Sequence, residues 1–249
     1  MNFVVYEHPL NEKARLLMRL ELLFQQLADF EALTEQQNVQ PFFTRLYDCI
    51  ELLERNDIRG TLTFYLDLLE KSMIRWSSHP EIQNESLQTK LKEAVRLQNE
   101  VNNMTKACQQ LKDDKFLASL RPRFGIAGGS CDFDLPQLHY WRNKPLAQRQ
   151  QDIDEWLAIL GPLRQALDFS LLFLRESGSF SPQQADNGFY QDSCADSVSL
   201  LRIRYDLSLG VFPMISGSHR RFSISFMRPD KCSVKTSVDD TIGFELANC

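Results

Sequence analysis

The residues most suited to chemistry lie in the stretch Lys115–Trp141, which has no regular periodicity and follows a long helical region. Within it, Cys131 and His139 could act as a thiolate nucleophile and its base, with the amides of Gly128 and Gly129 stabilising an oxyanion. However, no third residue that would orient the base is indicated, and a proline lies between the two side chains. Loop glycines and a partly buried thiol explain the same residues. We therefore expect no catalytic site, and a cysteine-dependent enzyme using Cys131 and His139 is the alternative.

The same stretch contains possible metal ligands, because the carboxylate and imidazole groups of Asp132, Asp134 and His139 suit several divalent ions. The D-x-D pattern followed by a proline is more typical of a turn that caps a short helix, predicted here over Leu135–Trp141. The glycine pair is too short for a phosphate-binding loop, and no Lys-Ser or Lys-Thr follows it. The sequence therefore predicts no metal and no cofactor.

Basic side chains indicate a binding function instead. Arginine suits bidentate contacts with carboxylates, and aromatic side chains can anchor apolar groups. If the fold brought three basic regions together beside the aromatic end of the central stretch, they could form a pocket for an acidic, partly apolar peptide. The candidate residues are Arg15 and Arg19; Lys115, Arg121 and Arg123; Arg220 and Arg221; and His139, Tyr140 and Trp141.

The charge distribution favours an acidic partner. The net charge of −5 and the lack of a recognisable module disfavour nucleic-acid binding. Nevertheless, Lys and Arg outnumber Asp and Glu in the segments Arg121–Arg149 and Leu200–Lys231, whereas acidic residues dominate between them. Like charges that cluster by segment can form a localised basic surface.

Targeting and cysteine patterns suggest an ordinary cytoplasmic protein. The N-terminus has no basic region followed by an apolar run, and no uninterrupted apolar segment of about 18 residues occurs, so we expect no membrane insertion. The six cysteines show no C-x-x-C pair and no repeated spacing. Free thiols are therefore favoured over a zinc module or a disulfide framework.

Most of the first half of the chain is predicted to be helical. After the β-prone residues Phe3–Tyr6, Asn11 can cap a helix that places Arg15 and Arg19 one turn apart on the same side. Apolar spacing and breakers define the segments that follow. Helices are predicted from Pro41 to Leu53, from the Asp57 cap through Trp76, from Glu81 to Asp114, and from Phe116 to Leu120, where Arg121-Pro122 ends the last of them.

Helical periodicity returns after the central stretch. A helix is predicted to start at Pro145, to be interrupted at Gly161-Pro162 and to continue from Leu163 to Leu174. The run Ser177–Asn187 has the composition of a loop.

The last third of the chain changes from a period of about 3.6 residues to a period of two, which is typical of strands. Arg221–Met227 and Ser199–Tyr205 alternate between apolar and polar residues, and the polar face would carry Arg202, Arg204, Arg220 and Arg221. Shorter candidates are Val211–Ile215, Gly243–Ala247 and a strand beginning at Phe189-Tyr190. Pro213 indicates an edge strand or a bulge.

These patterns predict an α+β protein, with a mainly α-helical domain and an appended antiparallel β domain. The predicted α-helical domain comprises residues 1–120 and 145–178, and the predicted β-strand domain comprises residues 121–144 and 179–249.

Several strings distributed along the whole chain resemble one family, the cell division protein family ZapD. E-H-P-L-N-E and G-G-x-C-x-F-D-L-P-x-L-H-x-W are its most specific patterns. The matching blocks are YEHPLNEKARLLMRLELLFQQL at Tyr6–Leu27, GIAGGSCDFDLPQLHYW at Gly125–Trp141, NGFYQD at Asn187–Asp192, ISGSHRRFSISFM at Ile215–Met227 and the closing FELANC.

The resemblance implies a cytoplasmic bacterial protein that binds the C-terminal tail of the tubulin-like division GTPase FtsZ. As a homodimer it would cross-link and bundle FtsZ filaments and stabilise the Z-ring at the division site, without catalysis or a cofactor. The family fold, a helical domain with a β domain and a basic central surface in the dimer, agrees with the pattern above. Family tail-binding positions fall on Arg19, Lys115 and His139. Relatives can carry arginine at Lys115, and lysine keeps the charge but loses the planar guanidinium.

Overall fold

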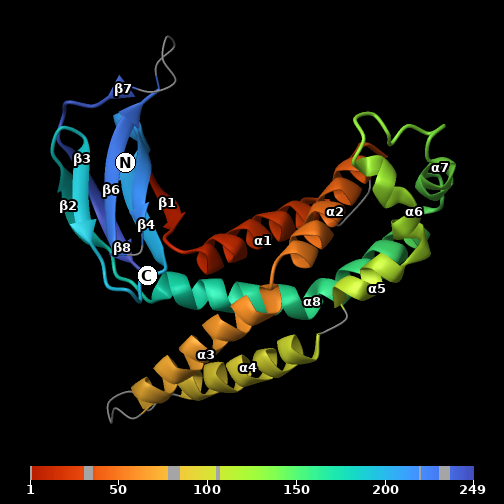
Figure 1. Cartoon of the computed structure of the whole chain (residues 1–249), viewed down its shortest axis with the longest axis horizontal. Coiled ribbons are helices and arrows are strands. Elements are labelled where there is room, and N and C mark those ends of the chain that lie inside the picture. The colour runs from red at the N-terminus through yellow and green to blue at the C-terminus, as the bar shows by residue number, and fades with distance from the viewer. Residues whose placement is uncertain (1, 31–35, 78–84, 105–106, 219, 230–235) are drawn as a thin grey trace. The chain divides into compact units, whose positions relative to one another are not determined.

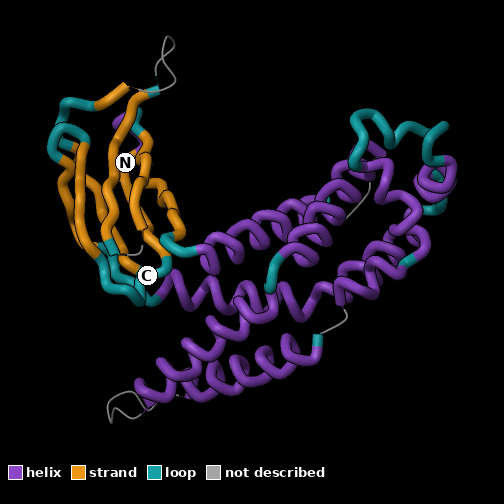
Figure 2. Tube along the Cα trace, in the orientation of Figure 1, coloured by secondary structure: helices purple, strands orange, loops and turns teal. Residues whose placement is uncertain are grey.

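The computed structural model describes residues 2–30, 36–77, 85–104, 107–218, 220–229 and 236–249. The chain divides into two compact units: unit 1 is Met1–Met18 with Leu171–Cys249, and unit 2 is Arg19–Ser170. Both boundaries fall inside helices, α1 (Glu12–Asp29) and α8 (Leu146–Glu176) (Figure 1). Helices make up unit 2 and antiparallel strands most of unit 1, so the predicted α+β class is confirmed (Figure 2).

In the described part of unit 1 the strands form two antiparallel sheets, with the orders β1-β4-β8-β2 and β3-β6-β5; β7 pairs with β6. Both sheets contribute to one hydrophobic core, to which the predicted alternating residues Phe222, Ile224 and Phe226 belong together with Ile203 and Phe244. The strands are β1 (Phe3–Pro9), β2 (Ser181–Ala185), β3 (Phe189–Ser193), β4 (Leu200–Asp206), β5 (Phe212–Ser218), β6 (Arg221–Arg228), β7 (Thr236–Ser237) and β8 (Ile242–Asn248).

One predicted loop contains a strand. Within the run Ser177–Asn187, β2 pairs with β8 and lies at the edge of its sheet, where Pro182 is tolerated because one side of the strand needs no partner. Asn187 and Gly188 then both adopt positive φ angles of 51° and 68°, as a two-residue turn between strands requires. The Asn-Gly pair was the sequence signal for this strand. Pro213 also lies on an edge strand, as predicted.

An arginine clamp holds the end of α8 to the sheet within unit 1. Glu7 on β1 accepts a 2.7 Å hydrogen bond from Nη2 of Arg175 and a 2.9 Å bond from Nε of Arg202. Nη1 of Arg202 in turn donates to the carbonyl oxygen of Arg175 at 3.0 Å. This bond satisfies one of the carbonyls that a helix C-terminus leaves without a partner.

The helices of unit 2 follow from the predicted caps and apolar faces. Asp57 Oδ1 accepts from the amide of Gly60 at 2.9 Å, and in unit 1 Asn11 Oδ1 accepts from the amide of Ala14 at 2.8 Å, so both predicted caps are confirmed. Helices α3 and α4 lie side by side as an antiparallel hairpin (Figure 1). The bounds are α2 (Val39–Arg55), α3 (Ile58–Ser77), α4 (Glu85–Asn103), α5 (Ala107–Asp113), α6 (Lys115–Phe124) and α7 (Pro136–Arg142).

An aromatic cluster around Phe43 forms the core that positions α6 and α7. The Phe43 ring lies 5.2 Å from Trp141, 5.7 Å from Trp156 and 5.9 Å from Phe124, measured between ring centroids. Asp114 caps α6 by accepting from the amide of Leu117 at 2.8 Å, and its other oxygen accepts from Nε1 of Trp156 at 3.1 Å. The core therefore fixes the start of α6 as well as its packing.

Two predicted helix ends are wrong for a common reason. The helix expected to end at Leu120 continues to Phe124, and the interruption expected at Gly161-Pro162 lies inside the continuous α8. A proline in a helix removes one hydrogen bond and adds a local clash. Tertiary packing outweighs this cost, because Phe124 packs on the aromatic cluster and residues on both sides of Pro162 are buried.

The compact units also differ from the predicted domain boundaries. Residues 121–144 contain helices and lie in unit 2, although we predicted them in the β domain, and residues 1–18 lie in unit 1. Strand β1 explains the second difference, because it pairs with β4 over its whole length.

By length and composition α8 could cross a membrane. Such a helix is equally typical of a protein core, and its residues Ile153, Leu160 and Leu167 are buried in unit 2.

Candidate functional site

The connection between α6 and α7 is fixed to both helices by its aspartates. Asp132 Oδ2 lies 2.9 Å from Nδ1 of His139, and both Asp132 oxygens accept from Nη2 of Arg142, at 2.8 and 3.0 Å. Asp134 lies 3.7 Å from Nη1 of Arg123 at the end of α6. The connection is thus anchored on either side of residue 133.

Hydrophobic side chains project from this anchored connection. Phe133 is 83% exposed and Tyr140 is 71% exposed. Trp141, which we had expected in the binding pocket with Tyr140, is only 2% exposed and donates from Nε1 to Asp152 at 2.6 Å. Trp141 is therefore a core residue, whose burial sets the orientation of α7.

Two of the predicted binding residues lie on the surface of these helices. Lys115 is exposed in the first turn of α6, and no ion pair joins it to any residue that the structure describes. The side chain of His139 is 54% exposed, even with its contact to Asp132. Both groups are therefore accessible to a partner.

A groove of about 450 Å³ lies between α1 and α2, and Arg19 lines it. Its apolar residues include Leu22, Leu23 and Leu52. No ion pair or hydrogen bond engages the exposed Arg19 guanidinium within the described ranges. The amide oxygen of Gln26, which also lines the groove, is buried and has no hydrogen-bond partner among the described residues.

Two further arginines of this groove are already paired on α2 itself. Arg45 contacts Asp48 at 2.7 Å, and Arg55 contacts Glu51 at 2.9 Å. Among the described residues of the groove, Arg19 is therefore the arginine that can bind an external carboxylate without breaking an ion pair. An exposed guanidinium can bind a carboxylate through two parallel hydrogen bonds.

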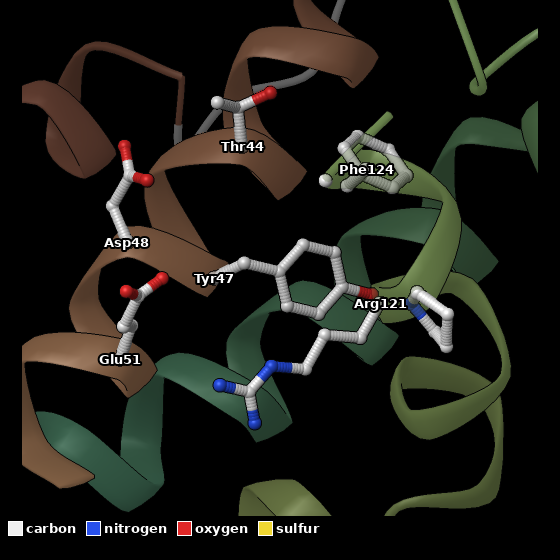
Figure 3. Close-up of a pocket in the computed structure, with 8 residues that line it drawn as sticks. Thr44, Tyr47, Asp48, Glu51, Arg121 and Phe124 are labelled. Carbon is white, nitrogen blue, oxygen red and sulfur yellow. The ribbon is translucent and has the colours of Figure 1, made fainter. Parts of the chain in front are cut away.

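A second pocket of about 450 Å³ lies between α2 and α6. Figure 3 shows Tyr47 from α2 and Arg121 from α6 pointing into the space between these helices. The two pockets share Asp48 and Glu51, so they adjoin across α2. Lys115 and His139 line neither of them.

Arg121 already has a strong partner. Its two terminal nitrogens donate to the two oxygens of Glu54 at 2.9 and 2.7 Å, and Lys112 approaches the same carboxylate at 3.1 Å. These contacts, the hydrogen bonds from Arg121 above all, lower the pKa of Glu54 to about 2. Burial raises the pKa of Tyr47, whose hydroxyl donates to the carbonyl oxygen of Leu117 at 2.9 Å. The pocket is therefore braced by internal contacts.

Three of the predicted basic residues belong to unit 1. Arg15 forms an ion pair with Glu12 in the first turn of α1. Arg220 contacts Asp196 at 2.9 Å, and Arg221 begins β6 with its side chain exposed. The other five candidates, Arg19, Lys115, Arg121, Arg123 and His139, belong to unit 2. A single pocket formed by all three basic regions stays a prediction.

The residues of the enzyme alternative make separate contacts. The thiol of Cys131 donates to the carbonyl oxygen of Gly128 at 2.9 Å, whereas His139 faces Asp132. A base that activates the thiol would have to contact it. Among the described residues, no group of three or more His, Cys, Asp or Glu side chains could hold a metal ion.

Sequence reasoning missed two parts of this surface. It identified Arg19 but not the groove. The available signal was Leu22 next to Leu23, because the two leucines widen the apolar face of the helix beyond the residues that pack into the core. It also treated the D-x-D pattern as a turn and said nothing of Phe133 between the two aspartates. Phe133 is exposed between Asp132 and Asp134, which pair with Arg142 and Arg123, and spacing alone does not reveal these pairs.

Unit 2 thus presents candidate binding residues on a helical scaffold: the exposed basic side chains of Arg19 and Lys115, the accessible His139, and exposed apolar side chains. The ZapD family model, described as a cell division protein, matches residues 18–225. The chain is similar to proteins named Cell division protein ZapD from Idiomarina loihiensis (39% identity, over 99% of this chain and 96% of the relative) and Photobacterium profundum (38%, over 98% of each). Another, from Pectobacterium carotovorum, is 36% identical over 99% of this chain and 97% of its own length. The chain therefore belongs to the ZapD family of cell division proteins.

Proposed function

We propose that this protein is a non-enzymatic division factor that binds the C-terminal tail of FtsZ and, as a homodimer, cross-links FtsZ filaments into bundles that stabilise the Z-ring. Membership of the ZapD family supports the role in cell division. The protein would act in the cytoplasm at the division site, without a cofactor, nucleic-acid binding or membrane insertion.

The observation that carries the proposal is the groove between α1 and α2. It combines the Arg19 guanidinium, which pairs with no residue that the structure describes, with the apolar side chains of Leu22, Leu23 and Leu52. A peptide with both carboxylate and apolar groups matches this combination, because the guanidinium binds the charge and the leucines exclude water around it.

Cross-linking follows from two tail sites in one dimer. Each protomer would hold one flexible tail weakly, and the second contact to a filament would then be intramolecular and favoured by effective concentration. The tail sites use exposed charges, which salt screens with a Debye length of about 8 Å near physiological ionic strength. Bundling should therefore weaken steeply as salt is raised.

The other predicted tail-binding residues differ in how far neighbouring residues already engage them. Lys115 and His139 are accessible in unit 2, so we propose them as further contacts of the tail. Arg121 and Arg123 would first have to share or exchange their present partners, Glu54 and Asp134. Their contribution should accordingly be smaller than that of Arg19. Arg15, Arg220 and Arg221 in unit 1 would add to the attraction of an acidic tail.

A peptide titration tests this proposal. An Arg19→Ala variant should bind a synthetic FtsZ tail peptide roughly five- to tenfold more weakly than the parent, because it removes a charge-assisted contact at a partly exposed site. Arg164→Ala is the matched control, since Arg164 is an exposed arginine of the same unit outside the groove. Equal binding by the parent and both variants would remove Arg19 from the site, and no binding by the parent would refute the proposed function.

A further inference from the structure

Phe133 stands out among the exposed apolar residues, because it is 83% exposed in a segment whose neighbours are fixed. On one side, Asp132 is bound by His139 and Arg142 of α7. On the other side, Asp134 pairs with Arg123 of α6. The exposed ring is therefore presented by a braced backbone.

The next residue, Leu135, strengthens this arrangement. It is 1% exposed, and its amide donates to the carbonyl oxygen of Cys131 at 3.0 Å, as does the amide of Asp134. This turn directs Leu135 inward and leaves Phe133 outside. An aromatic side chain on a braced backbone has only its own side-chain rotations to lose when a partner covers it, so the ordering cost of binding is reduced.

We propose that Phe133 is the apolar anchor of the tail-binding surface, a statement that rests on the proposed function and extends it. The occupant is the apolar part of the acidic tail peptide. Phe133 directly follows Asp132, whose carboxylate contacts His139, so it is one residue from the partner of a proposed polar contact of the tail. Asp132 and Asp134 are both paired with arginines, and the exposed Lys115 lies on the adjoining helix, so the two carboxylates that flank Phe133 repel an acidic peptide less than free carboxylates would.

The anchor explains how a weakly held charged tail could be recognised with specificity. Arg19, Lys115 and His139 supply polar attraction that any acidic segment would share, whereas a ring on a braced backbone selects a segment with an apolar side chain at the right position. Buried aromatic anchors commonly dominate the binding energy of an interface, and surrounding polar contacts contribute less.

Phe133→Ala tests the anchor in the full-length protein. We expect its affinity for the tail peptide to fall roughly tenfold or more, as for a central aromatic contact. Phe3→Ala, which truncates another exposed phenylalanine on β1, should bind like the parent. The loss caused by Phe133→Ala should persist at high salt, whereas the loss caused by Lys115→Ala should shrink, because salt screens charges and leaves apolar contacts in place.

A second peptide identifies what the ring contacts. If the apolar residues of the tail peptide are replaced by alanine and its acidic residues are kept, Phe133→Ala should cause no further loss. Normal peptide binding by Phe133→Ala, with weakened binding by Arg19→Ala, would overturn the anchor and leave the proposed function intact. Loss of self-association with unchanged peptide binding would also overturn it, by assigning Phe133 to contacts between two copies of the chain.

Discussion

Replacing Glu54 by glutamine isolates the contribution of the bidentate pair that braces α6 against α2. The carboxylate accepts two hydrogen bonds from Arg121 and lies near Lys112, and its pKa falls from 4.5 to about 2. A shift of this size corresponds to roughly 3 kcal/mol at most, since one unit is about 1.4 kcal/mol. The pair is partly exposed, so solvent screening reduces this value, and we expect Glu54→Gln to lower the free energy of unfolding by about 1–2 kcal/mol at pH 7.

The stability difference between the parent and Glu54→Gln should also depend on pH. A carboxyl whose pKa is lower in the folded state stabilises the protein above its unfolded pKa and loses that effect as the pH falls through the folded pKa. The difference between the parent and Glu54→Gln should therefore be complete above about pH 5 and shrink by roughly half or more by pH 3.

Urea unfolding at pH 7 and at pH 3 measures this difference. Glu51→Gln is the matched control, because among the described residues Glu51 pairs only with Arg55 along the same helix. This substitution should cost at most about 0.5 kcal/mol. A difference between the parent and Glu54→Gln that is the same at both pH values would refute the reasoning. Equal stability of Glu54→Gln and the parent at pH 7 would refute it as well.

Two further substitutions test a core residue and the enzyme alternative. Arg149 is 8% exposed, and its Nε and Nη1 have no hydrogen-bond partner in the described part of the chain. Arg149→Met should therefore leave the free energy of unfolding unchanged or raise it by about 1 kcal/mol, as measured by thermal unfolding. A clear loss of stability would reveal a partner of the guanidinium. Cys131→Ser should keep full filament bundling in a light-scattering assay, because the thiol donates to the Gly128 carbonyl oxygen and makes no other hydrogen bond to the described residues. Loss of activity would favour a thiol enzyme.

Alternation of apolar and polar residues predicted the strands well, whereas proline positions predicted the helix ends poorly. Alternation in Arg221–Met227 reflects one buried and one wet face, so it reports directly on the sheet. Proline signals failed inside α6 and α8, since the packing of Phe124 on the aromatic cluster and the burial of residues around Pro162 favour continued helix. Local signals cannot include packing partners that are distant in the sequence.

The same limit applies to the candidate site. Residue type singled out Arg19, Lys115 and Arg121 alike as candidate binding residues, but it could not show that Arg19 and Lys115 are exposed whereas Arg121 is engaged by Glu54, 67 residues away. Aromatic residues were harder still: Trp141 looked like a surface anchor and is buried, whereas Phe133 looked unremarkable and is exposed. Which aromatic residue faces solvent depends on the ion pairs and turns around it.

The central claim is that an acidic FtsZ tail binds at Arg19 and that two such sites in a dimer bundle filaments. Co-sedimentation of FtsZ filaments with the parent and with Arg19→Glu, both checked to be folded and dimeric, tests it most directly. The charge reversal should abolish most of the bundled pellet, and raising the salt should reduce the pellet formed by the parent. Pellets of equal size from Arg19→Glu and the parent would contradict the claim.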